Sequence, residues 1–167
     1  MTEKLKMQAL KLSDIDNIMS WINDPEVVKN LQHFDKKFTK KDELDYVKKM
    51  LASKNDFVFS FFTNTGDYIG QGGIHQISWQ NKLGRLSIII KREHWNKRYA
   101  QEILPALTSY AFKKLKIHKI WLMHWKENKK AAYLYKKFGF KKEGILKDEY
   151  FWKGRYHDMV RMVIIKK

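Results

Sequence analysis

The order in which strand-like and helix-like apolar patterns follow one another constrains this fold most. Three dense apolar stretches come in succession at 57–62, 68–78 and 86–90, joined by short connections that favour antiparallel pairing. After them the pattern becomes strand–helix–strand–helix, and a final strand pair closes the chain. We therefore predict an α+β fold of three layers. Its mixed, mostly antiparallel central sheet should have about six to seven strands, with helices on both faces.

The segments that precede this pattern predict one more strand and two helices. Residues 4–10 alternate polar and apolar side chains, which is typical of a half-buried strand. Ser13 and Thr39 are placed to cap two helices. The chain shows no repeat or linker, and its 167 residues are close to the roughly 150 typical of one domain. We expect a single domain over residues 1–167.

Composition excludes several classes of protein. With 44% hydrophobic residues the chain can build a folded core, and without cysteine it has no disulfide framework, thiolate metal site or cysteine nucleophile. No apolar run reaches the ~18 residues of a membrane span. We predict a cytoplasmic protein that has no membrane partner.

The chain is strongly basic. It has 34 Lys+Arg against 18 Asp+Glu, a net charge of +16, which attracts polyanions of any kind. Arginine, the residue that reads base edges, is scarce, so sequence-specific nucleic-acid binding is disfavoured. A solvated lysine-rich coat explains the charge equally well.

The segment from Trp95 to Ala100 has the properties of an anion site. It joins a predicted strand to the long helical pattern at 99–115, and a helix start exposes unpaired N–H groups with partial positive charge. Lys97 and Arg98 add full charges, which suits a phosphate or pyrophosphate. An ordinary solvated helix start is the alternative.

A second motif spans residues 128–140. Its pattern is Asn, two residues, Ala, then Leu-Tyr, then Gly-Phe, at Asn128, Ala131, Leu134, Tyr135, Gly139 and Phe140. It resembles the coenzyme-A-binding helix of the GNAT acetyltransferase family. Residues 93–100 fall where that family has its pyrophosphate loop. The segments 10–27 and 154–158 resemble the branch of ribosomal-protein and spermidine acetyltransferases.

The resemblance implies acetyl-CoA as co-substrate and a primary amine as acceptor. It assigns Tyr135 as the acid that protonates the departing thiolate, although a buried aromatic role would also fit its spacing. It assigns Asn128 to the pantetheine arm, with helix capping as a compatible role. The residues implied in binding the co-substrate are Ile88, Ile89 and Ile90 through their backbone, then Trp95, Asn96, Lys97, Arg98, Tyr99 and Ala100, and finally Asn128 and Ala131.

Two positions depart from the family pattern. Arg98 stands where the pyrophosphate loop has a glycine, and its side chain could either neutralise the phosphates or hinder the backbone contact. Arg85 stands where several relatives carry a glutamate as general base. His75 is the candidate base because its pKa range suits proton transfer. A strand histidine without that role, or a water-borne proton transfer, is the alternative.

Three classes of acceptor stay open: a ribosomal or other protein N-terminus, an amino sugar on a nucleotide, and a polyamine. The charge of +16 and the missing glutamate weigh against a polyamine. Glu26 and the cluster of Asp42, Glu43 and Asp45 could hold a cationic acceptor, but we expect these carboxylates to be solvated at the surface. No metal-ligand spacing is present, so we expect no metal. Monomer and homodimer fit equally. The rival hypothesis is a catalytically weak module of the same fold that binds coenzyme A, another anion or RNA.

Overall fold

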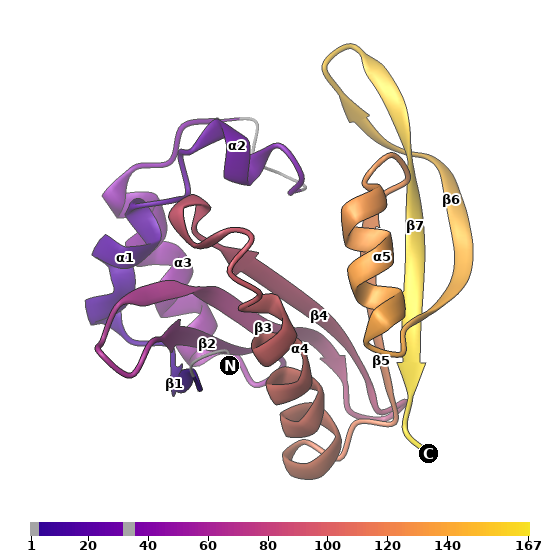
Figure 1. Cartoon of the computed structure of the whole chain (residues 1–167), viewed down its shortest axis with the longest axis horizontal. Helices are drawn as coiled ribbons and strands as arrows, with labels where there is room; N and C mark the ends of the chain where they lie inside the picture. Colours follow the sequence, from indigo (N-terminus) through magenta and orange to yellow (C-terminus); the bar gives the residue numbers. More distant parts are fainter. Residues whose placement is uncertain (1–3, 32–35) are drawn as a thin grey trace.

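The computed structural model describes residues 4–31 and 36–167, which form a seven-stranded sheet (Figure 1). Its spatial order is β1-β2-β3-β4-β5-β7-β6. All neighbouring strands pair antiparallel except β4 and β5, which are parallel. The strands are β1 (Lys6–Ala9), β2 (Phe57–Phe62), β3 (Tyr68–Ser78), β4 (Leu83–Ile90), β5 (Lys119–Trp125), β6 (Lys141–Trp152) and β7 (Arg155–Ile165).

Helices cover both faces of the sheet, as predicted. On one face α1 (Ile15–Met19) and α3 (Lys40–Ala52) enclose a core built around Ile18, Trp21 and Val47. On the other face α4 (Ala100–Ser109) and α5 (Lys129–Lys137) pack against a second core. The remaining elements are η1 (Leu12–Asp14), α2 (Pro25–Val28), η2 (Arg92–His94) and η3 (Tyr110–Lys114), a π-helical turn that follows α4.

Local chemistry explains where the helices begin. Thr39 caps α3 with a capping box, because its hydroxyl accepts from the Asp42 N–H while the Asp42 carboxylate accepts from the Thr39 N–H. The short helix α2 begins directly after Asp24. Asp24 caps it by accepting from the Glu26 N–H, and Pro25 occupies the first helical position.

The predicted cap at Ser13 was wrong. Residues 12–14 form the 3-10 turn η1, and Asp14 carries the polar contacts of this segment. The buried Asp14 carboxylate accepts from the Lys11 N–H and from the Ser60 hydroxyl of β2. These bonds fix the turn that leads from β1 to α1.

The parallel pair of strands opens the sheet. β4 and β5 pair only from Leu83–Lys119 to Arg85–Trp121, after which the register ends and the two strands diverge (Figure 1). β3 continues to pair with β4 as far as Ile90, and β7 pairs with β5 as far as Trp125. A gap between two well-supported strands is thereby built into the centre of the sheet.

Candidate active site

A cavity of about 1190 Å³ occupies the region where β4 and β5 diverge. Residues 86–90 of β4 line one wall, and Met123 and His124 of β5 line the opposite wall. The loop after β4, the inner side of α5 and the cavity-facing side of α3 complete it. One cavity therefore collects most of the residues that the sequence singled out.

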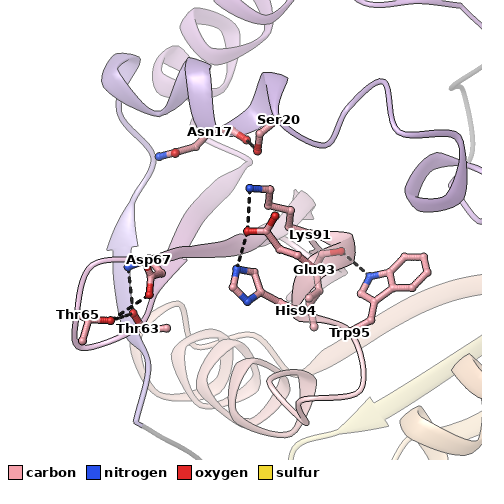
Figure 2. Close-up of polar contacts among 10 residues, drawn as sticks. Asn17, Ser20, Thr63, Thr65, Asp67, Lys91, Glu93, His94 and Trp95 are labelled. Carbon is pink, nitrogen blue, oxygen red and sulfur yellow. Dashed lines mark hydrogen bonds and ion pairs between the residues drawn. The ribbon is translucent and has the colours of Figure 1, made fainter.

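The open edge of β4 offers backbone groups to this cavity. The Lys91 N–H donates to the Ile69 carbonyl of β3, and hydrogen bonding alternates along an antiparallel strand. The peptide groups of Ile88 and Ile90 consequently face the gap, whereas those of Ile89 face β3. The Trp95 indole N–H donates to the Ile90 carbonyl at 2.8 Å, which anchors the following loop to the end of β4 (Figure 2).

The loop after β4 has the backbone conformation of a glycine-rich turn without its glycines. Asn96 has φ +62° and Arg98 has φ +65°, both in the left-handed region. The backbone N–H groups of residues 96–100 donate to none of the residues that the structure describes. They precede or open α4, so unpaired donors and the positive end of a helix dipole coincide here.

An ion pair between Glu93 and Lys91 lies at the base of this loop, with His94 beside it. The Glu93 carboxylate lies 3.0 Å from Lys91 Nζ and 3.4 Å from the buried His94 Nε2 (Figure 2). Burial, more than the cations Lys97 and Lys91, holds the pKa of His94 below its ordinary value despite Glu93. A neutral His94 packs edge-on against the Tyr99 ring, with ring centroids 5.7 Å apart.

All but one of the residues predicted to bind the co-substrate line the cavity. The exception is Lys97, which is exposed outside it. Arg98 lines the cavity, as do Ala100, Asn128 and Ala131. Asn128 Oδ1 accepts from the Ala131 N–H at 3.0 Å, so Asn128 caps α5 and faces the cavity at once.

Tyr135 lies on the inner side of α5 and lines the cavity. Burial raises the pKa of Tyr135 to about 12, so its hydroxyl keeps its proton at neutral pH. Its ring packs against Phe140 and against His124, whose centroid is 6.1 Å away. Sequence reasoning missed His124, which is buried with Nδ1 2.8 Å from the Trp125 carbonyl. Its Nε2 has no partner among the described residues.

A polar group lies on the opposite side of β4, facing α3. His75 Nδ1 lies 3.1 Å from Asp56 Oδ1, and His75 Nε2 lies 2.8 Å from Ser87 Oγ. Burial first, and then the nearby Arg85 guanidinium, hold the pKa of His75 below its ordinary value. Asp56, His75, Arg85 and Ser87 all line the cavity. His75, the predicted base, therefore lies in the same cavity as Tyr135, the predicted acid.

Glu43 was expected to be solvated, and that expectation was wrong. It is 2% exposed on α3, lines the cavity, and its Oε2 has no hydrogen-bond partner among the described residues. Burial, reinforced by Asp42, raises the pKa of Glu43 to about 7. A buried carboxylate without a partner is costly, and a cationic ligand would remove that cost. The signal that sequence reasoning overlooked is the four-residue spacing from Glu43 to the buried Val47.

The described part of the chain shows neither a metal-binding cluster nor a membrane-spanning helix. Among residues 4–31 and 36–167, no cluster of three or more metal-ligating side chains was found. The prediction that there is no metal stays a prediction. Within the same residues, no helix is long and apolar enough to cross a membrane.

Comparison with known proteins places this geometry in a family. Residues 4–141 match the model of the acetyltransferase (GNAT) domain. The chain is 30% identical over 167 residues to the spermidine N(1)-acetyltransferase of Vibrio cholerae, which covers 99% of this chain and 95% of that protein. A putative ribosomal N-acetyltransferase of Bacillus subtilis, YdaF, is 24% identical over 102 residues, or 61% of this chain and 56% of that protein.

A solved structure agrees with the fold over nearly its whole length. The crystal structure of spermidine N-acetyltransferase from Vibrio cholerae in complex with CoA and spermine superposes with a TM-score of 0.91. The sequences are 28% identical, and the match covers 97% of this chain and 95% of that chain.

Proposed function

This chain belongs to the GNAT acetyltransferase family, and on that premise we propose that it acetylates a primary amine of a small polyamine-like acceptor. It is an N-acetyltransferase with acetyl-CoA as co-substrate. The observation that carries the proposal is one cavity lined both by residues with unpaired backbone N–H groups and by Glu43, whose Oε2 has no hydrogen-bond partner among the described residues. We also propose that residues 1–167 form one catalytic domain.

The half of the cavity bounded by α4 and α5 suits the co-substrate. The N–H groups of residues 96–100 would hold the pyrophosphate, since unpaired donors at a helix start bind phosphate groups. The peptide groups of Ile88 and the N–H of Ile90 would pair with the amide-bearing pantetheine arm as an added strand would. Asn128 and Ala131 would bound that arm from the α5 side.

Tyr135 would act as the general acid. Acetyl transfer breaks the carbon–sulfur bond, and the departing thiolate takes up a proton. A hydroxyl whose pKa burial raises to about 12 is fully protonated at neutral pH and can supply that proton. The contacts with Phe140 and His124 fix the ring that carries it.

The half of the cavity bounded by α3 suits a cationic acceptor. Glu43 offers a free carboxylate oxygen in a buried setting, where an ammonium group would be bound more strongly than at the surface. An acceptor that loses a proton from a primary amine at one end, and keeps a second ammonium group at Glu43, is a polyamine. The relatives named for spermidine acetylation favour the same class.

The overall charge of +16 does not oppose this acceptor at close range. Exposed lysines are screened beyond about 8 Å at physiological ionic strength, whereas a buried carboxylate is screened much less. Asp56 also lines the cavity, and its charge partly offsets that of Arg85. Local carboxylates, rather than the lysine-rich surface, set the field that the acceptor meets.

The test is an acceptor panel assayed by thiol release from acetyl-CoA. It compares spermidine and spermine with a free N-terminal peptide and a nucleotide-linked amino sugar. We expect the polyamines to give the highest kcat/KM. Glu43→Gln should raise the polyamine KM about tenfold, roughly 1.4 kcal/mol, and leave the acetyl-CoA KM unchanged. Asp45→Asn, an exposed charge removal on the same helix, is the matched control and should change neither KM.

The outcomes separate the hypotheses. A peptide or an amino sugar as the best acceptor would show that the polyamine assignment is wrong while acetyl transfer stands. Acetyl-CoA binding by calorimetry without turnover of any amine would favour the catalytically weak binding module instead.

A further inference from the structure

We propose that Ser87 and His75 form a proton relay that receives the proton of the acceptor ammonium, and that Asp56 is the positioning residue of this relay. The inference rests on the proposed function. It identifies a general base for the reaction, a role that the arginine at position 85 cannot fill. The three side chains come from β4, from β3 and from the loop before β2. They form one chain of contacts, with Asp56 Oδ1 to His75 Nδ1 at 3.1 Å and His75 Nε2 to Ser87 Oγ at 2.8 Å.

The contacts of Asp56 fix the direction in which the relay works. Burial alone raises the pKa of Asp56, but hydrogen bonds from the Ser53 hydroxyl and the Gln76 N–H bring that pKa below its ordinary value. An ionised carboxylate only accepts hydrogen bonds, so His75 Nδ1 carries the proton and donates. Neutral His75 then has its lone pair on Nε2, and the Ser87 hydroxyl donates to it. The Ser87 oxygen keeps its lone pairs for the acceptor.

The backbone is shaped to make this chain possible. A β-bulge between His75 and Ser78 interrupts the pairing of β3 with β4, and Gln76 within it has φ +51°. A non-glycine residue in this region costs on the order of 1 kcal/mol, and such strain gathers at functional sites. Here the bulge directs the Gln76 N–H to the same Asp56 oxygen that holds His75.

A glycine leaves the space in which the His75 and Ser87 side chains meet. Gly73 is the residue directly opposite Ser87 across the β3–β4 pair. A Cβ on Gly73 would lie 3.0 Å from His75 Nε2 and 2.6 Å from the Phe57 carbonyl. The imidazole therefore occupies the space that a side chain at 73 would fill, and it reaches Ser87 diagonally across the strands.

The proton balance of the step is closed. The acceptor ammonium donates an N–H proton to Ser87 Oγ as the Ser87 hydroxyl proton moves to His75 Nε2. The products are a neutral amine, an intact serine hydroxyl and an imidazolium beside the Asp56 carboxylate. The neutral amine attacks the thioester carbonyl, the carbon–sulfur bond breaks, and Tyr135 protonates the departing thiolate. The acylated nitrogen then loses its second proton through solvent, which restores the Tyr135 hydroxyl, and the imidazolium returns its proton to solvent.

The charges that face His75 keep it ready to accept a proton. Arg85 lies opposite His75 in the β3–β4 register, Asp56 lies at Nδ1, and the hydroxyl of Tyr46 on α3 is near both Arg85 and Asp56. Burial lowers the pKa of His75 most, Arg85 lowers it further, and Asp56 partly restores it. Neutral imidazole is thus the resting form at neutral pH.

The experiment compares Ser87→Ala with Ser87→Thr, which keeps a hydroxyl on the same carbon. At pH 7 we expect Ser87→Ala to lower kcat/KM for the amine by about 100-fold, the lower end for a general base. Ser87→Thr should retain most of the activity. The loss in Ser87→Ala should shrink near pH 10, where solvent deprotonates much of a primary amine whose pKa is ~10. The acetyl-CoA dissociation constant should be unchanged in both variants, which shows that they fold.

Asp56→Asn tests the positioning role. Because the Asp56 charge raises the pKa of His75, its removal should move the acidic limb of the pH–rate profile to lower pH. An unmoved limb would overturn the positioning role. Full activity of Ser87→Ala at pH 7, beside an active wild type, would overturn the relay alone. A wild type that acetylates no amine would overturn the proposed function and the relay with it.

Discussion

Replacing Glu43 by Gln should make the protein more stable while weakening its hold on the acceptor. The pKa of Glu43 is raised from 4.5 to about 7. Each pKa unit corresponds to about 1.4 kcal/mol, so burying the charged carboxylate costs about 3 kcal/mol once it is ionised in both states. The folded pKa lies above the unfolded one. The cost is therefore small below pH 4.5, grows as pH rises to 7, and is fully present above it.

The glutamine variant removes this pH-dependent cost. The amide of the Glu43→Gln variant is still buried without a hydrogen-bond partner, but an amide does not titrate, so the free-energy cost of burying it does not change with pH. The gain in the free energy of unfolding over the wild type should consequently be about 2 to 3 kcal/mol larger at pH 9 than at pH 5. The change in the free energy of unfolding at pH 5 depends on how the amide packs. The difference between the changes at pH 9 and pH 5 does not depend on it.

Urea unfolding followed by tryptophan fluorescence at pH 5 and pH 9 measures this difference directly. Asp45→Asn on the exposed side of α3 is the matched control, and it should leave the pH dependence as in the wild type. Spermidine at saturating concentration should raise the wild-type melting temperature at pH 8 more than that of Glu43→Gln, because ligand binding stabilises the folded state. A gain of equal size at both pH values would refute the reasoning that Glu43 is buried with a raised pKa.

Three other changes test the rest of the site. Tyr135→Phe should lower kcat about 100-fold with an unchanged acetyl-CoA affinity by calorimetry, and an unchanged kcat would remove Tyr135 as the acid. Arg98→Gly should raise the free energy of unfolding by about 1 kcal/mol, because it relieves the left-handed φ of residue 98. The same change should weaken acetyl-CoA binding several-fold at low salt, because it removes a positive charge. Tighter binding would mean that the Arg98 side chain obstructs the phosphates. Gly70→Ala should destabilise the protein by at least about 2 kcal/mol in urea, because its Cβ would lie 2.1 Å from the Ile89 carbonyl. Gly144→Ala, with nothing within 4 Å, is its control and should be neutral.

Sequence alone was sufficient for the parts of this protein that depend on local pattern. The dense apolar stretch at 57–62 and the capping residue Thr39 predicted β2 and the start of α3 because each signal is complete within a few residues. The loop at 95–100 was predicted in the same way, from a strand–helix junction with basic residues. The mixed sheet followed from the order of these elements.

The polar chain from Asp56 to Ser87 could not be predicted in this way. It depends on Gly73 standing opposite Ser87 in the strand register and on a bulge after His75, and neither leaves a periodic signal. The burial of Glu43 depends on the rotation of α3, which places Glu43 and Val47 inward while Leu51 is 52% exposed. An acidic cluster predicts a solvated face, and here packing decided otherwise for one carboxylate of three.

The two arginines that depart from the family pattern illustrate the same difference between residue identity and geometry. Arg98 replaces a glycine, yet it adopts φ +65° and so keeps the loop conformation that leaves the N–H groups of 96–100 unpaired. The arginine changes only two things: it adds the strain energy of a left-handed φ, and it adds one positive charge. By the resemblance, Arg85 stands where several relatives carry a glutamate near the start of the open strand, and no backbone adjustment can restore a base there. In the relay that we propose, the proton acceptor lies instead on the neighbouring strand, where Asp56 and the bulge hold His75 against Ser87. A missing motif residue therefore means a lost function only where no neighbouring group lies in position to replace its chemistry.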